Sequence, residues 1–458
     1  MTKLLIRNLS GIKKMTTYVV LYMVTGTIVA LSVYATPEEQ SGYEILRFII
    51  VFCATILLSK YFFYMIVSPW YDVSVAYKEY KLSQIGTPLY EPRVSVLIPA
   101  WNEGHGVITT VRTLVESTYD NLEIVVINNA STDNTEALMQ AYKLEFEEVR
   151  GATSRKTIVY ANEQEQGKGH ALNAGLALAK GDIIMSIDAD CYVPRETISN
   201  FVRHFKDPKV MAAVGNVLIG NTRTLLGVIQ HLEFLFSFYF KKADSLLGTI
   251  YIIGGAAGAF RKEVFATLGS YSTTNITEDI ELSVRIQDAG MKIVYASDAV
   301  VFTEGAVTLS GLMKQRLRWK RGRFETFFEH TGLFFSFKSE HNKMLSWFVL
   351  PLAIFGEVQL SLEAWFLFFL YVFSYISNDY TSFISGIIVV SSMFVVQLLF
   401  DNRKGVHFGL ILLAPICWLL FYVSTFVETQ ALIRAIWGYV RGHKLEWQKW
   451  ARTGVFSP

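Results

Sequence analysis

The chain has 458 residues and a formal net charge of +2, with 52% hydrophobic and only 18% charged residues. Its mean hydropathy of +0.32 is too high for an ordinary soluble enzyme, and the near-neutral charge argues against a nucleic-acid partner. The three cysteines, Cys53, Cys191 and Cys417, form no spaced cluster, so neither a disulfide framework nor a zinc site is indicated.

Residues 1–70 contain two apolar runs, 15–35 and 45–70. Each is as long as the ~20 residues needed to cross a bilayer. Basic residues precede the first run, and the loop around 37–40 has none. The positive-inside rule therefore predicts a cytoplasmic N-terminus and returns the chain to the cytoplasm for residues 71–342.

Strand-like and helix-like segments alternate in the next part of the chain. Strands are expected at 94–99, 123–128, 157–160 and 182–188, and helices around 109–117, 135–147 and 168–179. This alternation predicts an α/β domain with a parallel sheet covered by helices on both faces. Ligands of such sheets bind beyond the carboxyl ends of the strands.

Polar residues gather at those strand ends, although each group alone is equally consistent with turn chemistry. Three follow the first strand, a loop of Asn and Asp residues follows the second, and two carboxylates follow the fourth. These candidates are Pro99, Trp101 and Glu103; Asn128 to Asp133, including Asn129; and Asp188 and Asp190. Carboxylates on alternate residues suit Mg²⁺ or Mn²⁺ bridged to phosphate.

Three further segments carry candidate site residues. Gly167–Asn173 opens a helix, where Lys168 is placed to meet a phosphate. The small residues 254–259, including Gly255, predict either a groove beside a bulky ligand or tight backbone packing. Thr277 is the expected N-cap of a helix through Ile286, and Glu278 and Asp279 follow it either as dipole partners or as catalytic carboxylates.

Two amphipathic stretches, 225–240 and 309–328, are predicted to lie at the membrane interface. In the second, Gln315, Arg318 and Trp319 share one helical face, which offers an amide, a cation and an aromatic plate. That face suits a diphosphate beside a sugar ring, or lipid headgroups. Arg316 is expected to point elsewhere and to tolerate substitution.

Residues 343–428 contain apolar stretches at 344–376, 381–400 and 406–427, followed by a basic, Trp-containing tail, 429–458. The first stretch reads as one long span, as two short ones broken near Gly356-Glu357, or as an interfacial helix plus a span. The basic tail favours an even number of crossings and a cytoplasmic C-terminus.

Six motifs occur in order between the predicted spans, and together they resemble the membrane-embedded processive glycosyltransferases of family 2. They are Pro99–Glu103, the 129–133 loop, Lys168–Asn173, Asp188-Ala189-Asp190, Thr277-Glu278-Asp279 and Gln315-x-x-Arg318-Trp319. Within the family, the chain most resembles bacterial poly-β-1,6-N-acetylglucosamine synthases, with hyaluronan synthases next. The resemblance implies a GT-A-like cytoplasmic domain between transmembrane segments of a multi-pass protein of the cell membrane.

The resemblance also implies a set of roles. Asp279 would be the catalytic base of an inverting transfer, and Asp190 would bind Mg²⁺ or Mn²⁺. A UDP-sugar, taken to be UDP-N-acetylglucosamine, would be bound by Pro99, Trp101, Glu103, Asn129, Lys168 and Asp188. The acceptor and diphosphate would meet Gly255, Glu278, Gln315, Arg318 and Trp319. The implied partners are the UDP-sugar, a growing polysaccharide exported across the membrane, the lipid bilayer and a small accessory membrane subunit.

The chain departs from the family at Asn128 and Asn129, where acidic residues are usual. An Asn carbonyl can still accept a hydrogen bond from a uracil N–H. Sugar identity and linkage stay open, so hyaluronan, chitin or cellulose-type synthases are alternatives. Two readings from other classes are a non-processive transferase acting on a lipid and a membrane scaffold without activity.

Overall fold

The computed structural model describes residues 44–85, 90–150, 154–378, 380–400 and 408–443. The chain divides into two compact units. A helical unit comprises Met1–Gly86, Leu235–Leu246 and Ala353–Gln430, and a sheet unit comprises Thr87–Phe234, Leu247–Leu352 and Ala431–Pro458. Each is described by itself below.

The sheet unit is built on seven strands in the order β3-β2-β1-β4-β6-β5-β7. They are β1 (Val94–Ala100), β2 (Leu122–Asn129), β3 (Thr157–Glu163), β4 (Ile183–Ser186), β5 (Val210–Ile219), β6 (Gly258–Arg261) and β7 (Lys292–Thr303). β6 runs antiparallel to both of its neighbours, β4 and β5, while the other pairs are parallel. The sheet is therefore mixed, and the expectation of a parallel sheet is wrong at β6.

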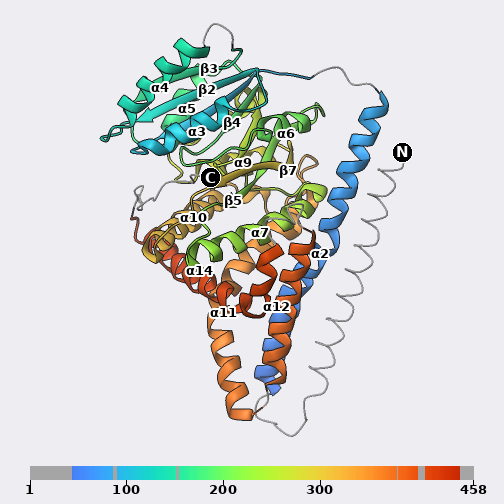
Figure 1. The fold of residues 1–458 in the computed structure, drawn as a ribbon. Coiled ribbons are helices and arrows are strands. Elements are labelled where there is room, and N and C mark those ends of the chain that lie inside the picture. Colours follow the sequence, from blue (N-terminus) through green and yellow to red (C-terminus); the bar gives the residue numbers. More distant parts are fainter. Residues whose placement is uncertain (1–43, 86–89, 151–153, 379, 401–407, 444–458) are drawn as a thin grey trace. The chain divides into compact units, whose positions relative to one another are not determined.

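Helices cover the sheet on both faces, which explains why β2 and β4 are continuous buried runs. The helices of the unit are α3 (His105–Val115), α4 (Thr135–Arg150), α5 (Lys168–Leu178), α6 (Thr197–His204), α8 (Lys262–Leu268), α9 (Glu278–Asp288) and α10 (Leu309–Glu329). α3 packs against α4, whereas α5 packs on β1 and β2 (Figure 1). Right-handed crossovers place α3 and α4 on one face and α5 on the other, because the strand order reverses between β1 and β4.

That reversal is the topological switch point of the sheet. In open α/β sheets, ligands bind outside the carboxyl ends of the strands at this point. The four predicted strands are confirmed within a few residues, and β1 and β4 carry the predicted site segments at their carboxyl ends. β5 and β7 are strands that were not predicted from the sequence, and β6 begins at Gly258, near the end of the small-residue segment 254–259.

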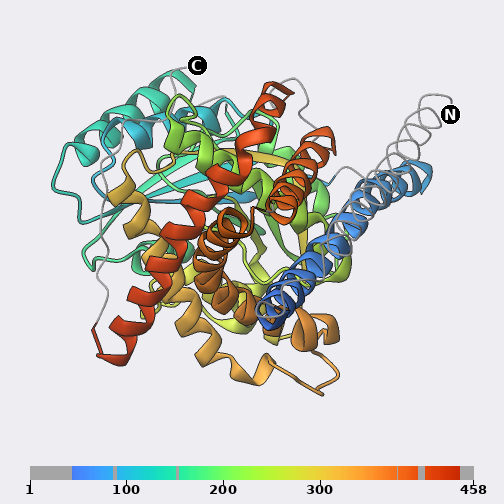
Figure 2. The same ribbon diagram turned by 90° about the horizontal axis from the view of Figure 1, so that it is seen from below.

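The helical unit contains α2 (Glu44–Ile85), α11 (Leu350–Ser377) and α12 (Thr381–Phe400), which is followed by a 3₁₀ segment (Phe408–Ile416). α7 (Leu225–Leu247) and α14 (Cys417–Val440) contribute residues to both units. α2 is one continuous helix (Figure 2), and its Met65 packs with Tyr239 of α7 and Val389 and Met393 of α12.

Among the described residues, one stretch, Gly409–Val440, is long and apolar enough to cross a membrane. Leu345–Leu360 and Phe383–Leu399 are shorter apolar helices. A π-helical turn (Leu345–Val349) leads directly into α11, and α11 continues through Gly356 and Glu357. A break near these two residues is therefore excluded. The predicted span 15–35 lies outside the described residues.

Candidate active site

The loops that follow β1 and β2 are held together by one side chain, Asn102. Its backbone adopts a positive φ of 55°, and its Oδ1 accepts hydrogen bonds from the N–H groups of Thr132 at 2.6 Å and Asp133 at 3.2 Å. Its own N–H donates to Ser131 Oγ at 2.9 Å. The sequence motif Pro99–Glu103 and the 129–133 loop thus form one structure.

Thr135, the first residue of α4, completes this junction. Its Oγ1 accepts from the N–H groups of Glu103 at 3.1 Å and Gly104 at 2.9 Å, and it donates to Asp133 Oδ1 at 2.5 Å. Pro99 lies within β1, opposite Ile127 of β2. Pro99, Trp101 and Glu103 are each half-buried at this junction, where the predicted nucleotide site lies.

Asn129 ends β2 and is 5% exposed. Its Oδ1 accepts from Gly167 N at 2.8 Å, and its Nδ2 donates to Glu165 O at 2.6 Å. Both ends of the amide therefore face the loop before α5. The structure brings Asn129 to the segment that carries Lys168, and its direct contact with a nucleotide stays a prediction.

Lys168 lies at the start of α5, among three carboxylates. Its Nζ is 2.6 Å from Asp188 Oδ1 and 3.3 Å from Glu278 Oε1. Burial alone would lower the pKa of Lys168, but the charges of Asp188, Glu278 and Asp279 outweigh burial and raise that pKa above its ordinary value. The ammonium is thus a fixed positive charge at the switch point.

Asp279, in the first turn of α9, is held by backbone donors on both oxygens. Gly255 N donates to Oδ2 at 2.7 Å, and Ile280 N donates to Oδ1 at 2.9 Å. The carbonyl of Gly255 accepts from Ser186 Oγ of β4 at 3.1 Å. A Cβ on Gly255 would come within 3.0 Å of Lys168 Nζ and lie 3.3 Å from Asp279 Oδ2. Glycine at this position therefore leaves room for the Lys168 ammonium next to the backbone that holds Asp279.

Glu278 is buried beside Lys168, at 4% exposure. Burial is the main cause that raises the pKa of Glu278. The positive charge of Lys168 lowers this pKa, and the negative charge of Asp279 raises it. The positive charge of Arg318 from α10 also lowers that pKa, which places Arg318 within electrostatic reach of the start of α9. Two of the predicted site segments therefore act on the same carboxyl group.

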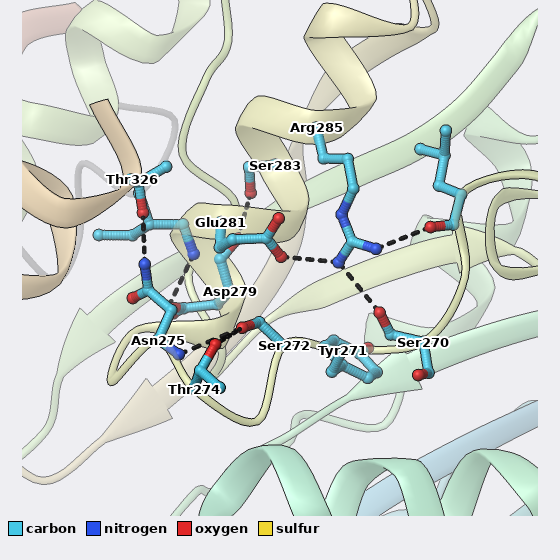
Figure 3. A network of polar contacts seen from close by, with 12 residues as sticks. Ser270, Tyr271, Ser272, Thr274, Asn275, Asp279, Glu281, Ser283, Arg285 and Thr326 are labelled. Carbon is cyan, nitrogen blue, oxygen red and sulfur yellow. Dashed lines mark hydrogen bonds and ion pairs between the residues drawn. The ribbon is translucent and has the colours of Figure 1, made fainter. Parts of the chain in front are cut away.

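Thr277 occupies the N-cap position of α9 as predicted, but its side chain makes no capping hydrogen bond. Its Oγ1 donates to Asn275 Oδ1 at 3.1 Å instead, and Asn275 Nδ2 donates to Thr326 Oγ1 of α10 at 3.1 Å (Figure 3). A Cβ on Gly322 of α10 would lie 2.7 Å from Thr277 Cβ. Close packing at Gly322 therefore sets α10 against the segment that leads to Asp279.

Within α10, Gln315 is 8% exposed, and its Oε1 has no hydrogen-bond partner among the described residues. Trp319 is half-buried, with the Phe234 ring at 6.4 Å. Arg316 is 5% exposed, pairs with Glu233 at 2.8 Å and lies over the Trp319 ring at 4.4 Å. The expectation that Arg316 points away from Trp319 is wrong, because Arg316 is buried between these two partners; its tolerance of substitution stays a prediction that this burial argues against.

The turn with Asp188 and Asp190 is held by Thr110 of α3. Its Oγ1 is 2.8 Å from Ala189 O and 2.7 Å from Cys191 O, and it accepts from Cys191 N at 3.1 Å. Asp190 is 7% exposed. Among the described residues, no group of three or more His, Cys, Asp or Glu side chains could hold a metal ion. The two carboxylates still fit a cation that takes its other ligands from a diphosphate and water.

Comparison with known proteins agrees with this architecture. The family model described as Glycosyl transferase family 2 matches residues 95–269. The one described as Glycosyl transferase family group 2 matches residues 183–426, which is more than half of the chain. The chain belongs to glycosyltransferase family 2.

Relatives in this family include the poly-β-1,6-N-acetyl-D-glucosamine synthase of Staphylococcus aureus, 32% identical over 51% of this chain and 55% of the relative. The synthase of Staphylococcus epidermidis is 31% identical over the same shares. The chain thus spans about half the length of the curated relatives that it matches. Among solved structures, the chain is similar to the mannosyltransferase PcManGT from Pyrobaculum calidifontis, which was solved in complex with GDP-Man and Mn²⁺. The match covers 83% of this chain and 99% of that one, with a TM-score of 0.51 and 20% sequence identity. That likeness shows the GT-A-like fold.

Several structural residues of this family 2 site were not singled out from the sequence. Thr110, Thr135, Ser283 and Gly322 are small residues in helices, with no local signal. Ser283 Oγ donates to Asp279 O at 2.6 Å and accepts from Ile253 N at 2.8 Å. Their roles depend on partners that are distant in sequence, and the sequence alone carries no sign of them.

Proposed function

We propose that the chain is an inverting, processive β-glycosyltransferase that polymerises UDP-N-acetylglucosamine into poly-β-1,6-N-acetylglucosamine and exports the product. One observation carries the catalytic part of this proposal. At the switch point, the Gly255 N–H holds the Asp279 carboxylate, and the missing side chain of Gly255 leaves room for the Lys168 ammonium, which pairs with Asp188. The product assignment is supported by the name of the staphylococcal relatives.

In the proposed reaction, an acceptor hydroxyl oxygen attacks the anomeric carbon as the bond to the diphosphate breaks. The hydroxyl proton passes to Asp279, and UDP leaves with its charge. Each Asp279 oxygen accepts one backbone N–H, which fixes the carboxylate and leaves lone pairs for the acceptor. One base and one displacement invert the anomeric centre, whereas a glycosidase uses a pair of carboxylates.

Lys168 is the protein's own cation for the departing diphosphate. In the structure its ammonium is paired with Asp188 and Glu278, so the site already balances this charge before a donor arrives. Asp188 and Asp190 would hold Mg²⁺ or Mn²⁺. When bound, such a cation neutralises the charge that develops on the leaving phosphate.

The acceptor would meet α10. Gln315 Oε1 is buried and unpartnered among the described residues, and a buried acceptor atom without a donor costs about 1–3 kcal/mol. A sugar hydroxyl donating to this atom would remove that cost. The exposed part of the Trp319 ring would pack against the apolar C–H face of the same sugar.

A bilayer location is supported by Gly409–Val440, which is long enough to cross a membrane. In the helical unit, α11 and α12 expose large apolar side chains, among them Phe355, Trp365, Phe368 and Ile384. Lipid chains would cover such side chains. We propose a multi-pass protein of the cell membrane with its sheet unit in the cytoplasm; the accessory subunit stays a prediction.

The proposal is tested with the purified full-length protein in lipid nanodiscs, given UDP-N-acetylglucosamine and Mg²⁺ or Mn²⁺. We expect UDP release and long product that a β-1,6-specific hydrolase digests. Asp279→Asn should lower turnover by about 10²–10⁴-fold and leave UDP binding within a few-fold. Glu263→Gln, in the exposed first turn of α8, is the matched control and should behave as wild type.

Three results would count against parts of this proposal. Turnover that survives Asp279→Asn removes Asp279 as the base. Products of one added sugar remove processivity and favour the non-processive lipid-acceptor reading. Preference for another UDP-sugar removes the product assignment and leaves the mechanism.

A further inference from the structure

Both polar atoms of the Asn129 side chain form hydrogen bonds with the loop that precedes α5. Asn129 Oδ1 accepts from Gly167 N at 2.8 Å, and Nδ2 donates to Glu165 O at 2.6 Å. The side chain is 5% exposed, so little of it is available to a nucleobase. Asn128, beside it, makes different contacts: Nδ2 donates to Asn162 Oδ1 at 3.0 Å, and Oδ1 accepts from Ser131 N at 3.3 Å.

The loop that Asn129 holds ends immediately before Lys168. Gly167 is the N-cap residue of α5 and has φ 138°, in the region that favours glycine. A Cβ on Gly167 would lie 3.2 Å from His170 Cδ2. The direction in which Lys168 leaves the loop is therefore set by a glycine with positive φ, whose N–H is fixed by Asn129.

The far side of α5 is also held in place. Asn173 exchanges two hydrogen bonds with the backbone of Tyr271, at 3.0 and 2.9 Å. A Cβ on Gly169 would overlap Ser272 O and lie 3.2 Å from Ser272 C. With α5 held there, Asn129 is the contact that fixes its first residue. Lys168 Nζ then meets Asp188 and Glu278.

The chemistry of this contact requires an amide. An aspartate could accept from Gly167 N, but it could not donate to the Glu165 carbonyl and would place a negative charge against it. The loop already carries the carboxylates of Glu163 and Glu165. The Glu163 carboxylate accepts a hydrogen bond from Glu165 N at 2.9 Å. The Glu165 carboxylate lies 2.9 Å from His170 Nδ1. A third carboxylate beside them would be repelled.

We propose that Asn129 is a positioning residue that places Lys168 against the donor diphosphate through Gly167. This inference rests on the proposed function, in which Lys168 binds the diphosphate. It accounts for asparagine at a position where the resemblance leads one to expect an acid. Asn129 acts on the phosphate end of the donor, at a distance, through the loop.

The test is a double-mutant cycle on the dissociation constant for UDP, measured by calorimetry on the full-length protein in nanodiscs with Mg²⁺. Asn129→Asp should weaken UDP binding about tenfold in the wild-type background. In a Lys168→Met background the same change should have less than about a twofold effect, because the group that it positions is gone. Donor KM should rise in parallel with UDP Kd, and the thermal midpoint should stay near that of wild type.

Asn128→Asp is the matched control, with the same chemical change one residue earlier. Its effect on UDP binding should be the same in both backgrounds, because Asn128 does not touch the 165–167 loop. Gly167→Ala changes the loop residue that Asn129 contacts. Its effect on UDP binding should likewise be larger in the wild-type background than in the Lys168→Met background. This variant replaces Asn129→Asp in the cycle if Asn129→Asp does not fold.

An Asn129→Asp effect of equal size in both backgrounds overturns the inference, as does wild-type UDP affinity in that variant. In both cases the proposed function survives if Lys168→Met weakens UDP binding. A wild-type protein that binds no UDP overturns the proposed function and the inference together.

Discussion

Gly255→Ala tests the geometry at the centre of the site. The added methyl would come within 3.0 Å of Lys168 Nζ, closer than Cβ contacts occur, while ordinary contact starts at 3.4 Å. To reach ordinary van der Waals contact, the ammonium must therefore withdraw by about 1 Å. The same methyl would lie 3.3 Å from Asp279 Oδ2, so the carboxylate is crowded as well.

The expected loss follows from that displacement. A misplacement of about 1 Å costs on the order of 10²-fold in rate. The ammonium must move by about that distance, so we expect kcat/KM for UDP release to fall on the order of 100-fold. The thermal midpoint should stay near that of wild type, because the atom that must move is the end of a flexible side chain.

Gly254→Ala is the control, because the same methyl one residue earlier has nothing within 4 Å among the described residues. Its UDP affinity should stay within about twofold of wild type. Both variants are assayed by coupled UDP release over a range of donor concentrations. Wild-type kcat/KM in Gly255→Ala would refute the argument that Lys168 must lie where the structure places it.

Two further variants test the packing around α9. Gly322→Ala places a Cβ 2.7 Å from Thr277 Cβ, and no side-chain rotation relieves this overlap. We therefore expect the variant to lower turnover by at least about tenfold. Gly332→Ala is the control and should match wild type, because nothing lies near its added Cβ among the described residues. The hydrogen bond that His330 donates to Glu281 raises the pKa of His330, so protonated His330 stabilises the fold below about pH 6.5 and this contribution is lost as the pH rises through the raised pKa. His330→Gln should therefore lower the thermal midpoint more at pH 6 than at pH 8.5, and an equal loss at both would contradict the assignment.

The sequence predicted β1, β2 and β4 because their Val- and Ile-rich runs are buried on both faces, and it also predicted β3, which is largely half-buried. It did not predict β6, whose four residues pair antiparallel on both sides. Strand direction depends on how the chain returns to the sheet, and no local pattern records this. A segment as short and small as 258–261 gives no periodicity to read.

The structure places predicted site residues at the ends of β1, β2 and β4, but the partners of these residues were not predictable. Helical spacing placed Arg316 off the site face, and the structure pairs it with Glu233, 83 residues away. The pairing of Lys168 with Glu278, from a different helix, is likewise a tertiary contact. Residue type therefore suggested which side chains to examine, whereas the charge pairs join residues that are distant in sequence and could not be predicted.

The end of α14 has a consequence for how the protein is made. Ala431 and Ala435 pack on Leu317 of α10. Arg321 of α10 donates to Ala435 O at 3.2 Å and lies over the Tyr439 ring at 4.8 Å. During synthesis these contacts form only after the ribosome has passed the last helix. A nascent chain that stops at residue 342 has every side chain of the proposed active site but leaves this side of α10 uncovered, so these contacts of α10 form only after the six motifs have been translated.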